Sequence, residues 1–198
     1  QDYKLSQIAR AINELDIDVV CFQEVAENWN NGAGDWNSNA AKVICERLDR
    51  RYHLFTDWAH LGFDRYREGV AILSKHPLQQ QEGRYVSPSQ DPYSIHARKA
   101  VAAQVDAPYV GKINIFSTHL SWWSDGFREQ FDTLAAWANS RHTGDVAATL
   151  ICGDFNIKAG SEGYAHIVQS SDYEDQFLKW MDRKLFDRVF RKRAEHWA

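Results

Sequence analysis

Residues 148–156 have the sequence ATLICGDFN, an apolar run that ends in the polar tetrapeptide Gly153-Asp154-Phe155-Asn156. A short apolar run bounded by turn residues is typical of a buried strand, which delivers the polar residues after it to a sheet edge. Asp154 would there offer a carboxylate to a hard cation or a water molecule. Asn156 would project the same way if the chain stays extended, and its amide can donate to a phosphoryl oxygen. Gly, Asp and Asn are also ordinary turn residues, so the tetrapeptide alone is a weak signal.

Three upstream segments also combine an apolar run with a polar residue at one end. Residues 18–24 (DVVCFQE) end in Glu24, residues 68–74 (EGVAILS) begin with Glu68, and residues 113–120 (INIFSTHL) carry His119 near their end. We expect these groups to gather with Asp154 and Asn156 at one rim of a sheet. Metal-assisted hydrolysis of phosphoesters requires carboxylates, an amide and a histidine of this kind.

The ordered set of motifs resembles that of the endonuclease/exonuclease/phosphatase superfamily, which includes pancreatic-type deoxyribonuclease, abasic-site endonucleases, sphingomyelinases and inositol polyphosphate phosphatases. The motifs follow the family's order from about Leu5 to Phe190, and they are Gln23-Glu24, residues 68–74, Arg98-Lys99-Ala100, Thr118-His119-Leu120 and residues 153–156. The resemblance implies an α/β (α+β) protein, a four-layer α/β/β/α sandwich of two mixed sheets flanked by helices. A further likeness to bacterial maltose-6'-phosphate phosphatase-like members rests on residues 58–66 (WAHLGFDRY) and on Trp122-Trp123.

The resemblance implies a role for each catalytic candidate. Glu24 is expected to hold a metal ion, most plausibly Mg²⁺ because its ligands would be oxygen atoms, with Mn²⁺ as the alternative. Asp154 would orient or deprotonate the attacking water, and Asn156 would hold the phosphate. Glu68 would orient His119, which would donate to a phosphate oxygen or protonate the leaving group. Taken alone, Glu24 is better explained as a surface acid, and Glu68 could be a member of a salt bridge. The ordered set of motifs favours the catalytic interpretation of both.

The candidate substrate contacts come from the same resemblance. Arg98 would bind phosphate through its guanidinium group, although it could instead brace the sheet. Trp122 and Trp123, with Trp58, would form a stacking surface for a sugar ring or a base, and the alternative is that all three belong to the core.

One domain is expected over residues 1–198, since this length supports one sizeable core and not two. Family members usually begin with a strand that carries an Asn and end with a Ser-Asp-His strand, and neither is present in this sequence. Asp187, within residues 185–190 (LFDRVF), resembles the family Asp that normally orients the missing His. We therefore expect a domain that lacks the first and last strands of the family.

The composition indicates in which compartment the protein is expected and which classes of partner it is expected to bind. The formal net charge of −4 argues mildly against avid nonspecific DNA binding, which depends on Lys and Arg. Cys21, Cys45 and Cys152 follow no metal-ligand spacing and indicate reduced thiols in a reducing compartment, the cytoplasm. No apolar run approaches the roughly 18 residues of a membrane span.

Three functions follow, in order of preference. The first is a phosphomonoesterase acting on a sugar phosphate, favoured by the acidic charge, the tryptophans and the closer family likeness. The second is a nuclease or phosphodiesterase of the same chemistry. It needs a basic surface, which could be supplied by the region of Arg65, Arg67, Arg84, Arg98 and Lys99. The third is a non-catalytic binding module.

The secondary structure expected along the chain alternates helices and strands. A first helix would bury the stripe Leu5, Ile8, Ala9, Ile12 and Leu15, and a polar loop would follow Glu24 over Glu27–Asn39. Further helices are expected at Ala40–Leu48 and Phe127–Asn139, and strands at Tyr52–Trp58, Val70–Leu73, Ala100–Val105 and Ile113–Thr118. This order suggests two packed sheets flanked by helices.

Overall fold

A computed structural model describes residues 2–181, so Asp187 and the tail after it lie outside the described residues. The first sheet contains β1 (Val19–Asn30), β2 (Ala33–Gly34), β3 (His53–Gly62) and β4 (Tyr66–Ser74), in the order β2-β1-β4-β3. The second contains β5 (Gln79–Tyr85), β6 (Lys99–Ala107), β7 (Gly111–His119) and β8 (Val146–Asp154), in that order. The helices are α1 (Asp2–Glu14), α2 (Ala40–Glu46), α3 (Phe127–Arg141), α4 (Glu162–Ser170) and α5 (Gln176–Met181), with short 3-10 turns η1 (Trp36–Ser38) and η2 (Trp123–Asp125).

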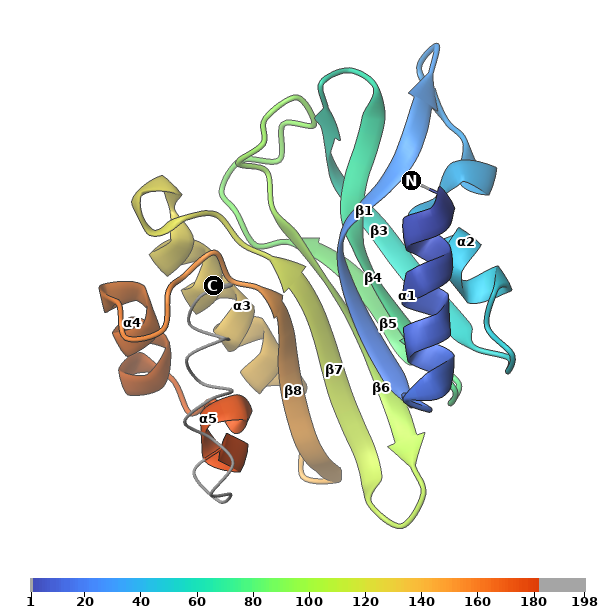
Figure 1. Cartoon of the computed structure of the whole chain (residues 1–198). Coiled ribbons are helices and arrows are strands. Elements are labelled where there is room, and N and C mark those ends of the chain that lie inside the picture. The colour runs from blue at the N-terminus through green and yellow to red at the C-terminus, as the bar shows by residue number, and fades with distance from the viewer. Residues whose placement is uncertain (1, 182–198) are drawn as a thin grey trace.

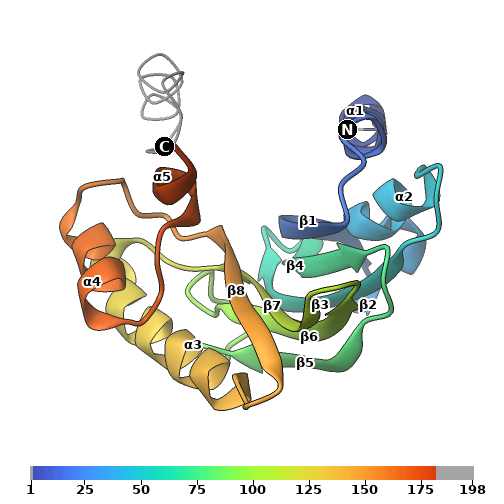
Figure 2. The ribbon, with the colours of Figure 1, turned by 90° about the horizontal axis from the view of Figure 1, so that it is seen from below.

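The two sheets pack face to face with helices on both outer sides (Figures 1 and 2). Helices α1 and α2 cover the first sheet, and α3 lies along the second, which confirms the expected four layers. The described strand pairs of the first sheet are antiparallel, whereas β8 joins β7 in parallel. Parallel pairing requires a crossover, which α3 provides.

Three apolar clusters hold these layers together. Between the sheets, Val70 and Ile72 of β4 face Val101, Val105 and Ile115. The outer clusters fix α1 and α2 on the first sheet and α3 on the second.

The apolar patterns place most elements correctly. All four strands expected between Tyr52 and Thr118 lie within β3, β4, β6 and β7, apart from Tyr52 itself, and both later helices are present. On α1, Leu5, Ala9 and Ile12 face the core, whereas Ile8 and Leu15 are exposed. The three cysteines are free, as expected, and half-buried.

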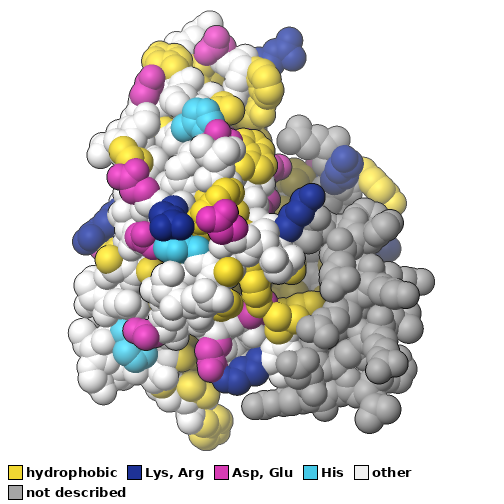
Figure 3. Space-filling view, turned by 90° about the vertical axis from the view of Figure 1, so that its left-hand side faces the viewer, with side chains coloured by type: hydrophobic (Ala, Val, Ile, Leu, Met, Phe, Trp, Pro, Cys, Tyr) yellow, Lys and Arg dark blue, Asp and Glu magenta, His cyan; other side chains and the backbone are white. Residues whose placement is uncertain are grey.

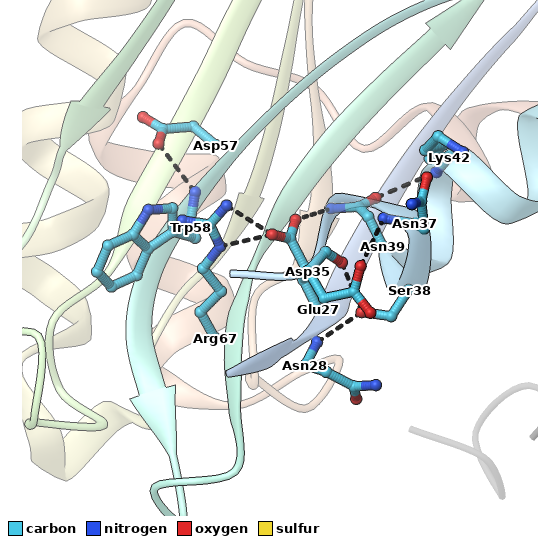
Figure 4. A network of polar contacts seen from close by, with 10 residues as sticks. All are labelled: Glu27, Asn28, Asp35, Asn37, Ser38, Asn39, Lys42, Asp57, Trp58 and Arg67. Carbon is cyan, nitrogen blue, oxygen red and sulfur yellow. Dashed lines mark hydrogen bonds and ion pairs between the residues drawn. The ribbon is translucent and has the colours of Figure 1, made fainter. Parts of the chain in front are cut away.

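The sequence predicts a polar loop over Glu27–Asn39. The prediction is wrong for residues 27–30, because β1 continues to Asn30. The cause is the carboxylate of Glu27, which is buried on the outer face of the first sheet. It accepts hydrogen bonds from Arg67 Nη2 (2.6 Å) and Nε (3.0 Å) and from Asn39 Nδ2 (2.9 Å). This network fixes both ends of the segment (Figure 4), so the segment is an ordered part of the first sheet.

The apolar patterns do not predict β5, α4 and α5. Strand β5 (QQQEGRY) is an edge strand with mostly polar residues, so it lacks the alternation that identifies a half-buried strand. Among residues 2–181, no helix has both the length and the apolar character needed to cross a membrane.

The end of β8 lies unusually close to β7. A Cβ added at Gly153 would lie 2.1 Å from the carbonyl oxygen of Thr118, far inside van der Waals contact. Gly153 therefore sets how closely the two strand ends approach, and Thr118 and Gly153 are paired in register. The next pair is His119 and Asp154, so this approach brings two catalytic candidates together.

We expect Gly153→Ala to lower the free energy of unfolding by roughly 2–3 kcal/mol, because the added methyl group forces the two strands apart. Urea denaturation would measure the loss. Gly144→Ala is the matched control, since nothing lies within 4 Å of a Cβ at Gly144. Equal stability of the two variants would contradict the proposed packing constraint.

Candidate functional site

A bulge in β1 presents Glu24 to solvent. The register with β4 shifts between Phe22 and Val25, so Gln23 and Glu24 lie opposite the single residue Val70. Glu24 adopts a positive φ of 52°, which is uncommon for a residue with a side chain. Gln23 turns toward the second sheet and donates to Ser117 Oγ at 3.2 Å. Bulges are frequent beside active sites because they re-aim a side chain, as this one does for Glu24.

Glu68 lies between buried His60 and half-buried His119. Its Oε1 is 3.7 Å from His119 Nδ1 and 3.6 Å from His60 Nε2. Burial and the charge of Glu24 raise the pKa of Glu68, while Arg98 opposes the shift. Burial, assisted by Arg98, lowers the pKa of His119 to about 4. His119 is therefore neutral at pH 7 in the substrate-free protein.

The ends of β7 and β8 are cross-linked by backbone and amide hydrogen bonds. Leu120 N donates to Asp154 O at 2.9 Å, and Asn156 Nδ2 donates to Leu120 O at 2.8 Å. The backbone N–H of Asn156 donates to Asp154 Oδ1 at 2.8 Å and fixes that carboxylate. The chain is not extended here, contrary to the sequence expectation: Asn156 has a φ of 51°, and its amide also supports the turn.

Arg98 is the central cation of the site. It is only 4% exposed, and its Nε donates to Ser121 Oγ at 3.3 Å. Gln130 of α3 holds Ser121 in turn, because it accepts from Ser121 N at 2.9 Å. Burial lowers the pKa of Arg98, whereas the carboxylates of Glu68, Asp154 and Glu24 raise it, in that order. Carboxylates from β4, β8 and β1 thus act electrostatically on one guanidinium group.

The three tryptophans expected at the mouth lie in different places. Trp123 packs against Phe127 and His166 in the helical layer, with Arg128 over its ring. Trp58 contacts Trp29 and Arg67 beside the Glu27 network (Figure 4). Trp122 is 48% exposed and follows the His119 strand end, whereas Trp58 and Trp123 are half-buried. Trp122 is therefore the tryptophan that we retain as the candidate substrate contact.

A divalent cation fits the oxygen donors of this site. Among residues 2–181, no cluster of three or more His, Cys, Asp or Glu residues has the arrangement of a metal cage. Glu24 is nevertheless an exposed carboxylate with no Lys or Arg within ion-pair distance in the described part of the chain. Mg²⁺ keeps several waters and commonly binds through one or two carboxylates, so a single donor of this kind suits it.

Sequence reasoning missed several residues that complete the site: His60, Tyr66, Ser121 and Gln130. Tyr66 lies near the acids, since Glu68 and Glu24 add to the effect of burial in raising its pKa. His60 pairs with Glu68 across the β3–β4 hairpin. The hairpin pairing could have revealed His60 from the sequence, whereas Ser121 and Gln130 depend on helix packing that has no local signal.

Comparison with known proteins gives one family. The model of the endonuclease/exonuclease/phosphatase family matches residues 2–194. No curated protein sequence matches the chain.

Solved structures share the fold. A protein described as an endonuclease/exonuclease/phosphatase family protein from Leptotrichia buccalis is 26% identical, with a TM-score of 0.78 over 90% of this chain and 69% of that one. The catalytic domain of human Nocturnin with bound sulfate is 17% identical, with a TM-score of 0.62 over 85% of this chain and 63% of that one. ANGEL2, described as a 2',3'-cyclic phosphatase, is 23% identical, with a TM-score of 0.58 over 80% of this chain and 45% of that one. The chain thus spans less than two thirds of the last two, which show the fold alone.

The lowered pKa of His119 predicts a pH dependence of stability. Between pH 6.5 and about 4 the unfolded chain binds a proton at His119 that the folded chain does not, so stability falls as the pH falls. We expect His119→Asn to remove roughly 2–3 kcal/mol of the difference between the unfolding free energies at pH 7 and pH 4.5.

Urea denaturation at the two pH values would measure this change. The control is His96→Asn, because His96 is exposed and should leave the pH dependence intact. An unchanged pH dependence in His119→Asn would show that His119 titrates normally in the folded protein.

Proposed function

The chain belongs to the endonuclease/exonuclease/phosphatase family, whose members hydrolyse phosphoesters, and we propose that it is a divalent-metal-dependent phosphomonoesterase acting on a sugar phosphate. The observation that carries this proposal is the convergence of Glu24, Glu68, Arg98, His119 and Asp154. They come from distant parts of the chain and meet as one group of interacting charges.

The metal would be held by Glu24, and it would supply positive charge that polarises the phosphoryl group. Arg98 would bind two phosphate oxygens through its guanidinium group, since the carboxylates around it hold it in place. Because Arg98 is fixed before substrate arrives, little reorganisation accompanies binding.

Asp154 would orient the attacking water and accept its proton as the oxygen attacks phosphorus. One carboxylate oxygen of Asp154 is already held by the N–H of Asn156. The ester P–O bond then breaks, and the leaving oxygen needs a proton. Negative charge on bound phosphate would raise the pKa of His119, which would then donate a proton from Nε2 while Nδ1 faces Glu68.

The charge pairing favours a small substrate over DNA. Arg67, Arg84 and Lys99 each lie within ion-pair distance of a carboxylate. Arg65 is exposed, so it is the residue of this region that could still contact a phosphate backbone. On the face in Figure 3, acidic and basic side chains are interspersed and form no continuous basic band. A nuclease needs such a band to track the phosphate backbone, and salt-sensitive DNA binding would support that alternative.

The sugar preference rests on Trp122 alone. A half-exposed indole beside the strand end that carries His119 can stack on the apolar face of a sugar ring. The third possibility, a binding module without catalysis, involves family positions near Asp187 that lie outside the described residues.

We expect Asp154→Asn to lower phosphate release from sugar phosphates by about 10²–10⁴-fold, because the water loses its base. The panel would include maltose 6'-phosphate, and each assay would be run with Mg²⁺ and with EDTA beside a plasmid-nicking assay. The control is Asp145→Asn, because Asp145 directly precedes β8, at the end opposite Asp154, and pairs with Lys112. Mg²⁺-dependent release without nicking supports the proposal. Nicking without release would make the protein a nuclease, and full activity of Asp154→Asn would contradict the site assignment.

Trp122→Ala should raise KM for the preferred sugar phosphate by roughly three- to tenfold while leaving kcat for a small aryl phosphate unchanged, since it removes only the stacking contact. Trp36→Ala is the matched control, because Trp36 is equally exposed (47%) but lies beside the Glu27 network. The same KM in both variants would remove Trp122 from the substrate site.

A further inference from the structure

His60 is a buried histidine that the proposed reaction does not use. Strand β3 has a register shift between Trp58 and His60, and this shift places His60 directly opposite Glu68. Only 5% of His60 is exposed. A polar side chain buried this deeply next to a catalytic acid requires partners for both ring nitrogens.

The partner of Nδ1 determines which ring nitrogen of His60 carries the hydrogen. His60 Nδ1 lies 3.1 Å from the carbonyl oxygen of Ala97, which can only accept. Nδ1 must therefore carry a hydrogen, and Nε2 is left facing Glu68 Oε1 at 3.6 Å. Ala97 directly precedes Arg98, so His60 connects the acid to the backbone that positions the guanidinium group.

The contact between Nε2 and Oε1 is attractive only if one proton lies between them. A bare Nε2 would repel a carboxylate, whereas a proton on either atom gives a hydrogen-bonded pair. Burial lowers the pKa of His60 and raises that of Glu68, so both groups are driven toward the state that shares a single proton. The charges that act on the pair are those of Arg98 and Glu24, and His119 lies 3.7 Å from the same oxygen of Glu68. Asp154 acts on Arg98 and His119.

We propose that His60 is a positioning residue: it holds Glu68 through one proton shared between Nε2 and Oε1, and Glu68 so held keeps the hydrogen of His119 on Nδ1. His119 Nδ1 lies 3.7 Å from the same Oε1, so Glu68 can accept its N–H only while the carboxyl group keeps this orientation. Both separations exceed hydrogen-bond length in the substrate-free protein, and catalytic hydrogen bonds commonly tighten when substrate binds. The inference rests on the proposed function, since it concerns the same histidine.

Two substitutions separate this role from simple core packing. Asn at position 60 places an amide near the position of Nδ1, so it keeps the bond to Ala97 O but does not reach Glu68. Gln places its amide near the position of Nε2, so it keeps a donor to Glu68 but loses Ala97 O. His53→Gln, on the same strand but away from the acid, is the control for loss of a histidine.

The experiment is ¹⁵N NMR of the imidazole rings together with steady-state kinetics of the full protein. We expect His119 to carry its hydrogen on Nδ1 in the wild type and in His60→Gln, and to show mixed tautomers in His60→Asn. We expect His60→Asn to lower kcat by about 10–100-fold with little change in KM, and His60→Gln to retain activity within about threefold. The proposal would be overturned if both variants lowered kcat equally, or if the loss of kcat in each variant followed the loss of its melting temperature.

A reciprocal measurement covers the case in which the His60 variants do not fold. Glu68→Gln should shift the ring ¹⁵N resonance of His60 Nε2, because it removes the partner of the shared proton. An unchanged resonance would also overturn the proposal. The NMR result is independent of turnover, so a protein without phosphatase activity would refute the proposed function and still decide the role of His60.

Discussion

The site depends on the buried guanidinium group of Arg98. Burying a cation is costly unless opposite charges and hydrogen bonds offset the loss of water. Arg98 donates to Ser121, and the negative charges of Glu68, Asp154 and Glu24 favour its charged form. The dependence is mutual, because three carboxylates would repel one another without this cation. Strands β1, β4 and β8 each contribute one of these acids. The charges of the site are therefore balanced only when the two sheets pack against each other in this arrangement.

The same arrangement leaves the histidines neutral and the acid ready to accept a hydrogen bond. Burial and Arg98 both disfavour an imidazolium ion at His119, and a bound phosphate would reverse that preference. In the proposed mechanism, proton transfer from His119 would therefore be coupled to substrate binding. Backbone strain at Glu24 and Asn156, both at positive φ, is consistent with a site whose geometry is held by the surrounding strands.

The sequence predicts the part of this structure that depends on apolar periodicity and motif order. Strands β3, β4, β6 and β7 have apolar runs, and the motifs around Glu24, Glu68, His119 and Asp154 follow the order of the family. The polar edge strand β5 escapes prediction because few of its side chains face the core. The bulge at Glu24, the turn at Asn156 and the separation of Trp58, Trp122 and Trp123 depend on register and packing, which residue spacing does not encode. His60 is an intermediate case: residue spacing alone does not identify it, but the pairing of the β3–β4 hairpin places it opposite Glu68.

The most direct test of the proposed site is a crystal structure of the full protein with Mn²⁺ and vanadate, with the metal located by anomalous scattering. We expect a Mn²⁺ peak within ligand distance of a Glu24 carboxylate oxygen. We also expect an oxyanion bound to Arg98 and His119, with the Asp154 carboxylate facing the vanadium. A metal peak away from Glu24, or vanadate bound outside this group of residues, would contradict the convergence of these residues into one catalytic site.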